Sequence, residues 1–344
     1  MAMDLNSRIV IAGAGSIGCY LGGRLALAGR NVTLLLRETL AAPVTAHGLR
    51  VSGLLQSDQL LPPGSLAVAT EASNAFSGAD IIVVTVKCRH TGEMADLIAR
   101  HAPQRLVVVS AQNGVDNVPL LQERLGQDRE VVAAMIPFNV VQTRKNGEAP
   151  RFHRATAGTV QIADRVPGLA GLLDVPGASV TEHGDIDAVL WGKLLINLNN
   201  ALNALSGLPL KQELGDRRWR MLLAKQMHEA FPVLSAAGIK VAPVEGMPLR
   251  LIALALRLPD WLFKRAAHKM LAMDASARSS MWEDLKMGRP TEIDCIQGAV
   301  TRRAEALGLD VPLTRRILQL IRDAERASSG SPALTPKQVE TGAS

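Results

Sequence analysis

One helical pattern in the second half of the chain carries polar side chains suited to chemistry at a carbonyl group. Lys193, Asn197 and Asn200 fall within one stripe of a helix that turns by about 100° per residue. The rest of this helical surface is apolar, and Asn is a poor helix former, so a polar cleft wall is favoured over a stripe in solvent. An ammonium group in such a wall can stabilise an oxyanion and then protonate it.

A glycine-rich segment near the N-terminus has the spacing Gly-x-Gly-x-x-Gly, and its residues are Gly13, Ala14, Gly15, Ser16, Ile17 and Gly18. It ends a β-type run over 8–12 and opens a helical pattern over 16–29, which is the context in which this spacing binds a dinucleotide. The first glycine allows a tight turn, the second lets the backbone approach the pyrophosphate, and the third permits close packing of helix on strand. The phosphates would lie at the helix N-terminus, whose N–H groups and dipole favour anions.

The residue after the second β-type run, 32–36, indicates which dinucleotide is bound. NAD enzymes usually place Asp or Glu there, whereas this chain has Arg37, which suits a 2′-phosphate. We therefore expect NADPH. Glu38 keeps NADH open, because a register shift of one residue would exchange the two roles. A third interpretation is that Arg37 is a solvated charge at a strand end.

Four further polar residues lie at the ends of predicted elements and also have simpler interpretations. Lys87 follows an apolar β-type run and could be a surface charge. Asn113 precedes Gly114, which is an ordinary turn signal. Ser280 and Glu292 could both cap helices.

The elements that would position these residues fall into two groups. Up to about residue 181, β-type runs rich in branched residues alternate with helical patterns, as in a parallel sheet covered on both faces. Long helical patterns follow, over 186–205, 219–237, 248–273, 297–307 and 313–327. We therefore predict an α/β Rossmann-type doubly wound domain over 1–184, an all-α domain over 185–327, and a disordered tail over 328–344 that is rich in Ser, Gly, Pro and Thr.

Composition excludes several classes of protein. The three cysteines form no Cys-x-x-Cys pair, so we expect no metal site. The net charge is +6, but the arginines lack the interleaved aromatic residues of a nucleic-acid surface, and an anionic cofactor or substrate explains a basic chain as well. Residues 1–8 lack the layout of a signal peptide and no apolar run is long enough to cross a bilayer, so we expect a cytoplasmic protein with no membrane partner. A homodimer stays open.

Five segments, in this order along the chain, resemble the ketopantoate reductase family (2-dehydropantoate 2-reductase). They are the loop 13–18, Val86-Lys87, Gln112-Asn113-Gly114, Leu190 to Leu194 with Asn197, and Ser279-Ser280-Met281 followed by Thr291 to Asp294 and Gly298. The resemblance runs from about residue 9 to 312. It implies a Rossmann domain, a helical domain like that of 6-phosphogluconate dehydrogenase, and NADPH-dependent reduction of 2-dehydropantoate to pantoate in pantothenate synthesis.

The same resemblance implies a role for each matching residue. Lys193 corresponds to the general acid, and Glu292 to the acidic group associated with it and with the cofactor. The other implied contacts are Asn197 and Ser280 to the substrate, Asn113 to substrate and cofactor, and Lys87 and Arg37 to the cofactor.

Two features depart from the family pattern. The family's second helical asparagine falls at Ala201, so either Asn200 takes its place or that substrate contact is missing. The stretch 241–273 is also longer than the minimal pattern. Both leave open a paralogous reductase of another 2-oxoacid. A non-catalytic NADPH-sensing regulator is a further alternative, although a sensor would need neither Lys193 nor Glu292.

Overall fold

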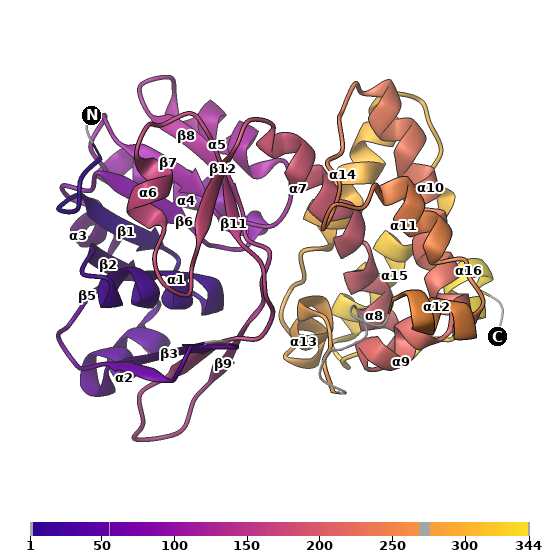
Figure 1. The fold of residues 1–344 in the computed structure, drawn as a ribbon, viewed down its shortest axis with the longest axis horizontal. Coiled ribbons are helices and arrows are strands. Elements are labelled where there is room, and N and C mark those ends of the chain that lie inside the picture. The colour runs from indigo at the N-terminus through magenta and orange to yellow at the C-terminus, as the bar shows by residue number, and fades with distance from the viewer. Residues whose placement is uncertain (1–2, 55, 268–275, 343–344) are drawn as a thin grey trace. The chain divides into compact units, whose positions relative to one another are not determined.

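The computed structural model describes residues 3–54, 56–267 and 276–342 (Figure 1). The chain forms two compact units, Met1–Ile186 and Asp187–Ser344. Strands and helices alternate in the first unit, and the second consists mainly of helices. The predicted fold class, a Rossmann-type domain followed by an all-α domain, is therefore confirmed.

The main sheet of the first unit has the order β12-β11-β8-β7-β6-β1-β2-β5. Its strands are β1 (Arg8–Ala12), β2 (Asn31–Leu35), β5 (Ala67–Ala69), β6 (Ile81–Val84), β7 (Val107–Ser110), β8 (Glu130–Met135), β11 (Val160–Ala163) and β12 (Val180–His183). The pairs from β8 across to β5 are all parallel, whereas β11 runs antiparallel to β8. Strand order reverses between β1 and β6, and ligands of such sheets bind beyond the carboxyl ends of the strands at this switch point.

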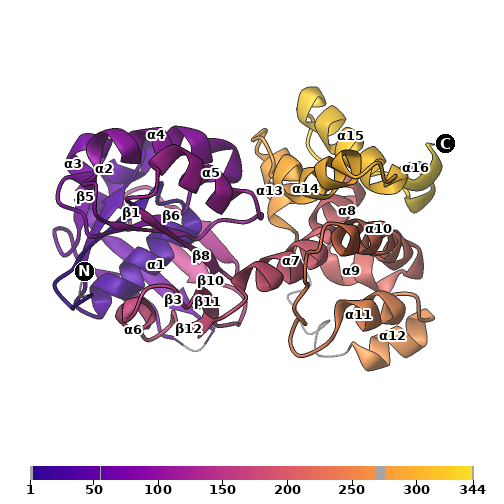
Figure 2. The same cartoon turned by 90° about the horizontal axis from the view of Figure 1, so that it is seen from above.

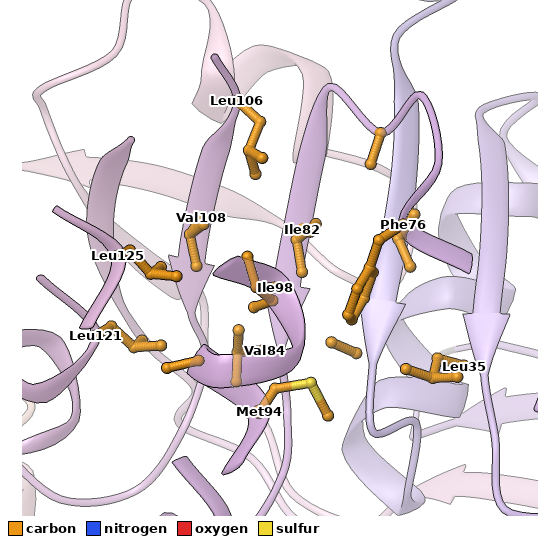
Figure 3. Packing of buried hydrophobic residues seen from close by; sticks show 14 of the residues in the cluster. Leu35, Phe76, Ile82, Val84, Met94, Ile98, Leu106, Val108, Leu121 and Leu125 are labelled. Carbon is orange, nitrogen blue, oxygen red and sulfur yellow. The ribbon is translucent and has the colours of Figure 1, made fainter. Parts of the chain in front are cut away.

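Helices cover both faces of this sheet (Figure 2). They are α1 (Ser16–Leu27), α2 (Glu38–His47), α3 (Ala72–Phe76), α4 (Thr91–His101), α5 (Asn117–Leu125) and α6 (Leu169–Leu173), with a 3-10 turn η1 (Cys88–His90) before α4. On the face of α3 to α5, Met94 and Ile98 of α4 pack on Ile82 and Val84 of β6 (Figure 3). The continuous apolar runs seen in the sequence are thus strands buried on both faces.

A second sheet of the first unit, with the order β4-β3-β10-β9, does not follow from the sequence patterns. Its strands are β3 (Leu49–Gly53), β4 (Gln59–Leu61), β9 (Val140–Thr143) and β10 (Arg151–Arg154). It joins β3 to β10 in parallel although they are about a hundred residues apart in the sequence. Local periodicity carries no signal for such a pairing.

The helices of the second unit are α7 (Ile186–Asn197), α8 (Asn199–Ser206), α9 (Leu210–Gly215), α10 (Arg217–Ala236), α11 (Leu249–Ala255), α12 (Asp260–Ala266), α13 (Ser280–Lys286), α14 (Ile293–Ala306), α15 (Pro312–Ala327) and α16 (Pro336–Thr341). None of the helices in the described ranges is long and apolar enough to span a bilayer.

Two of the predicted long helices are shorter than their patterns. The pattern 186–205 is divided at Leu198 into α7 and α8. The pattern 248–273 forms α11 and α12, with Pro259 as the N-cap of α12, and its last residues lie outside the described ones. Proline has no N–H group and restricts the residue before it, so it ends a helix that hydrophobic periodicity alone would continue.

The prediction of a disordered tail is wrong for residues 328–342. Helix α16 begins with a capping box in which Thr335 and Gln338 satisfy each other's backbone N–H groups. Val339 of this helix is fully buried, and Arg316 of α15 donates to its carbonyl oxygen at 2.7 Å. The composition of this segment is typical of a linker, but a single buried side chain and a few long-range hydrogen bonds order it.

A fully buried arginine, Arg220 of α10, holds α9, α11 and α12 together. Its guanidinium group donates to the carbonyl oxygens of Leu214, Leu256 and Leu258 at 2.8, 3.1 and 2.7 Å. It also pairs with Asp260. Part of the long stretch 241–273 is thus fixed to the helical core by one side chain.

Candidate active site

Neighbouring atoms leave no room for a side chain at two of the three glycines of the loop, Gly13 and Gly18. Gly13 has φ +74°, and a Cβ there would lie 2.0 Å from Cγ1 of Val86. A Cβ at Gly18 would lie 2.4 Å from Oγ1 of Thr85, so only glycine lets α1 pack this closely. At Gly15, which is exposed, the nearest described atom to a Cβ would be the Gly13 carbonyl oxygen at 4.0 Å. The backbone at Gly15 is therefore open to a ligand, as a pyrophosphate site needs.

The loop is fixed to the sheet on one side and opens α1 on the other. The Ala14 N–H donates to the carbonyl oxygen of Leu35 at 3.0 Å. Helix α1 begins at Ser16, and its N-cap is Gly15, which has no side chain with which to cap. The half-exposed Ser16 and Ile17 supply backbone N–H groups in the first turn, where the helix dipole favours an anion. These residues fit the phosphates of a dinucleotide.

Arg37 lies where the sequence analysis expects it, at the carboxyl end of β2. It is exposed and forms the N-cap of α2, and Glu38 is the first residue of that helix. An acidic residue in the first turn of a helix is stabilised by the helix dipole, which gives Glu38 a structural role of its own. Arg37 is thus the last residue of the two-residue link, Leu36 and Arg37, between β2 and α2.

The turns after β6 and β7 carry Lys87 and Asn113, and a buried polar network ties them together. The Gln112 side chain donates to the Val86 carbonyl oxygen at 3.0 Å and to the Thr91 hydroxyl group at 2.7 Å. Asn117 in turn accepts from Thr91 at 2.8 Å and donates to the carbonyl oxygen of Asn113 at 2.7 Å.

These hydrogen bonds fix the backbone of the turns after β6 and β7, and the one to Asn113 is made by its backbone carbonyl oxygen. Lys87 is half-buried rather than a fully solvated charge. Sequence reasoning missed Thr91 and Asn117, because a polar residue at a helix start has no distinguishing local signal.

In the second unit, Lys193 of α7 is partly buried, and burial lowers its pKa to about 8. The negative charge of Glu292 opposes this shift and raises the pKa. A lysine with such a pKa is still largely protonated at neutral pH but gives up its proton more readily than one in water. Glu292, about a hundred positions further on in the sequence, is therefore close enough for its charge to act on Lys193.

Glu292 is the N-cap residue of α14, yet within the described ranges its side chain makes no capping hydrogen bond. Thr291 serves the helix start instead, since its hydroxyl group accepts from the N–H of Ile293 at 3.2 Å. The capping interpretation of the Glu292 side chain is thus wrong, and its charge acts on Lys193.

Close packing explains Trp191 and Gly192, the two residues before Lys193. Trp191 is buried with the Arg303 guanidinium group 4.6 Å from its ring centroid. A Cβ at Gly192 would lie 2.7 Å from the carbonyl oxygen of Ala242, so glycine lets the chain after α10 pass directly over α7.

Asn197 ends α7, and Asn200 lies in the first turn of α8. Both are half-buried, whereas Ala201 is fully buried. The Leu198 carbonyl oxygen, at the break between the two helices, accepts from the buried Gln297 side chain at 2.9 Å. Lys193 and Asn197 thus lie on α7 and Asn200 lies on α8, and Leu198 between the two helices keeps helical dihedral angles.

The N-cap of α13 is Ser279, so the capping interpretation of Ser280 is wrong. The Ser279 hydroxyl group accepts from the Trp282 N–H at 3.2 Å and donates to the Asn200 carbonyl oxygen at 3.0 Å. Ser280 is the first helical residue and is exposed. The structure thus joins the start of α13, with Ser280, to the residue Asn200 of α8.

The fold and these sites define the class of the protein: a Rossmann-type domain with a glycine-rich loop of the dinucleotide-binding type, followed by a helical domain with a partly buried lysine and carboxylate. The family descriptions "Ketopantoate reductase PanE/ApbA" and "Ketopantoate reductase PanE/ApbA C terminal" match residues 9–166 and 185–325. The chain therefore belongs to the ketopantoate reductase family, a family of oxidoreductases, as the sequence motifs indicated.

Individual relatives agree with this assignment. The chain is 30% identical over 333 residues to the 2-dehydropantoate 2-reductase of Halobacterium salinarum, covering 93% of this chain and 99% of that protein. The solved PanE/ApbA family ketopantoate reductase of Ralstonia eutropha JMP134 is 29% identical, with a TM-score of 0.77 over 93% of this chain and 99% of that one. A D-mandelate dehydrogenase solved with NADH and anilino(oxo)acetate shares the fold at 19% identity, with a TM-score of 0.75 over 93% and 99% of the two chains.

Proposed function

We propose that this protein reduces 2-dehydropantoate to pantoate with NADPH, in pantothenate synthesis. The observation that carries the proposal is Lys193, a partly buried lysine whose pKa burial lowers to about 8 while the charge of Glu292 opposes that shift. Relatives named 2-dehydropantoate 2-reductase support the substrate.

Lys193 is the proposed general acid. Its ammonium group binds the keto oxygen, stabilises the negative charge that develops there, and donates the proton that completes the hydroxyl group. Glu292 raises the pKa of Lys193 and so keeps the lysine protonated against the effect of burial.

Neutral hydrogen-bond donors are proposed to hold the rest of the oxoacid. The amides of Asn197 and Asn200 and the hydroxyl group of Ser280 would donate to its oxygens, and Asn113 would contact both substrate and cofactor. Asn200 is proposed to replace the family's second asparagine, because the fully buried Ala201 has no polar side-chain atom and Asn200 is partly exposed.

The first unit, with the predicted domain bounds 1–184, is proposed to hold the cofactor. The loop 13–18 would bind the pyrophosphate, Lys87 would be a further contact, and Arg37 would pair with the 2′-phosphate. A bound reduced nicotinamide supplies the hydride. Glu292, on the helical unit, is also a proposed contact of the cofactor. NADH is the alternative, supported by Glu38 beside Arg37 and by the D-mandelate dehydrogenase solved with NADH.

The test is oxidation of NADPH and of NADH by the purified protein with 2-dehydropantoate, beside 2-oxoisovalerate, pyruvate and oxaloacetate. We expect the highest kcat/KM with NADPH and 2-dehydropantoate. Preference for another oxoacid would identify a paralogous reductase. Tight NADPH binding with no turnover of any of the four would overturn the proposal in favour of a non-catalytic sensor.

Two further expectations accompany this function. The ketopantoate reductase of Staphylococcus aureus, 18% identical with a TM-score of 0.67, is described as dimeric. We propose that this protein is also a homodimer, which light scattering would test. The cytoplasmic location stays a prediction.

A further inference from the structure

The helical unit contains a buried acid that the proposed reaction does not use. Glu213 of α9 has an exposed fraction of 0%. Burial raises its pKa to about 8, although hydrogen bonds from the Asn203 and Asn199 side chains lower it in part. Burial penalises the carboxylate form of an acid and not the neutral form.

The hydrogen bonds around Glu213 leave two acceptors without a donor. Nδ2 of Asn203 donates to Oε2 of Glu213 at 2.5 Å. The Asn199 side chain is also in hydrogen-bonding contact with the carboxyl group. Yet among the described residues, Oε1 of Glu213 and Oδ1 of Asn199 are buried and have no partner. A proton on Oε1 would make it a donor to Oδ1, and both atoms would then be satisfied.

The charged side chains around α9 do not account for the state of Glu213. Helix α8, which carries Asn199 and Asn203, has no charged residue. The other charged residues of α9 and the nearby ones of α10 and α12 are Lys211, Arg217, Arg218, Arg220, Asp260 and Lys264. Arg220 bonds to backbone carbonyl groups and Asp260, and Arg218 pairs with Asp216. Arg278, just before α13, lies over the ring of Trp282. The described causes of the Glu213 shift are burial and the two amides alone.

A chain of hydrogen bonds leads from Glu213 to the proposed substrate contacts. Oδ1 of the fully buried Asn203 accepts from the Ser279 N–H at 2.8 Å. The Ser279 hydroxyl group donates to the carbonyl oxygen of Asn200 at 3.0 Å. Ser280 is the next residue, so the amide of Asn203 stands between the acid and the start of α13.

We propose that Glu213 is a positioning residue held as the neutral acid. Its proton is on Oε1 and is donated to Oδ1 of Asn199, with the Asn199 amide turned so that its oxygen faces the acid, and Oε2 accepts from Asn203. Asn203 in turn holds the start of α13, which carries Ser280, against α8, which carries Asn200. The effect on substrate binding rests on the proposed function, whereas the protonation and the ordering of α13 do not.

Glu213→Gln separates a neutral acid from a carboxylate. Glutamine places an acceptor toward Asn203 and a donor toward Asn199, the same pattern as the protonated acid. The alternative is a carboxylate that accepts from both amides, which needs the N–H group of Asn199 to face Glu213. In that case the N–H group of the new glutamine would face an N–H group of one of the two asparagines. We expect Glu213→Gln to keep KM for the oxoacid within about twofold, and Glu213→Leu to raise it about tenfold, the loss of roughly one hydrogen bond.

The matched control is Thr314→Val. Thr314 is also fully buried in the helical unit, and its hydroxyl group donates to Glu229 at 2.7 Å, away from the chain of contacts to Ser280. This variant should lose stability without a change in KM, whereas neither substitution of Glu213 should alter the Kd for NADPH. A KM that rises equally in Glu213→Leu and Thr314→Val would reduce Glu213 to a general structural role and overturn the proposal.

Two readouts need no turnover. Hydrogen exchange of the Ser279 amide should be protected in wild type and Glu213→Gln and fast in Glu213→Leu. The stability of wild type relative to Glu213→Gln should fall as pH rises from about 5 to about 8, because a pKa raised from 4.5 to about 8 makes the folded state bind more protons in that window.

A flat difference across that window, or equal protection of Ser279 in all three proteins, would overturn the proposal. A wild type that reduces none of the oxoacids would overturn the proposed function alone, since these two readouts would still decide the role of Glu213.

Discussion

The interaction between Glu292 and Lys193 makes a pH-dependent prediction for Glu292→Gln. Burial lowers the pKa of Lys193 to about 8 and the Glu292 charge raises it, so removal of that charge leaves burial unopposed. The pKa should then fall further, and the protonated form that acts as the acid should be lost at a lower pH.

The size of the loss follows from the protonated fraction of the lysine. A neighbouring opposite charge shifts a pKa by about 1 to 3 units, and we take the smallest value. A fall from about 8 to about 7 reduces the protonated fraction at pH 8 from about one half to about one tenth, a loss of about fivefold in kcat. At pH 6 more than about nine tenths stays protonated, so the loss there from this cause is small.

The assay is kcat for NADPH oxidation at saturating oxoacid and cofactor between pH 5.5 and 9, in wild type, Glu292→Gln and the control Asp294→Asn. Asp294 is exposed, two residues further on, and pairs with Arg322. We expect the alkaline limb to move to lower pH in Glu292→Gln only. A loss of kcat that is uniform across the pH range would show that the Glu292 charge does not set the pKa of Lys193, and Glu292 would then have a role that does not depend on pH.

The other predictions concern single side chains. Lys193→Ala should stay folded and bind NADPH, but lose about 10² to 10⁴ in kcat, or roughly 2.7 to 5.5 kcal/mol; kcat within about threefold of wild type would mean another proton donor. Arg37→Asp should raise the Kd for NADPH far more than that for NADH, and equal losses would show that Arg37 does not face the 2′-phosphate. Ser280→Ala should raise KM for the oxoacid by an amount equivalent to about 1.5 to 3 kcal/mol, with the cofactor Kd unchanged. Arg220→Leu should lower the free energy of unfolding in urea by about 3 kcal/mol or more, because two buried carbonyl groups and one partly buried one lose their donor, whereas Leu at the exposed Arg218 should cost less than about 1 kcal/mol.

Local patterns in the sequence were enough for the dinucleotide loop and for the alternation of strands and helices. Glycine spacing, the apolar run before it and the helical pattern after it involve residues that are neighbours in the chain, so their interactions depend little on the rest of the fold. The positions of Lys87, Asn113 and Arg37 at strand ends follow from the same patterns, since parallel strands bring their carboxyl ends to one edge.

The sequence alone did not predict features that depend on contacts between distant segments. The pairing of β3 with β10, the order of the tail through Val339, and the division of the helical patterns at Leu198 and Pro259 were not predicted. Hydrophobic periodicity reports which face of an element is buried, but not which segment covers it or where a long-range hydrogen bond ends a helix.

For the candidate site, the sequence supplied the residues and the tertiary structure decided their surroundings. Family motifs picked out Lys193 and Glu292, but only the fold brings the carboxylate near enough to act on the pKa of the lysine, and only burial lowers that pKa. Likewise, Ser279 and Ser280 are equivalent as sequence, and the hydrogen bonds of Ser279 to Trp282 and Asn200 separate the helix cap from the exposed hydroxyl group. Desolvation and hydrogen bonding depend on distance and on excluded water, and both are properties of the packed chain that residue types and spacing do not contain.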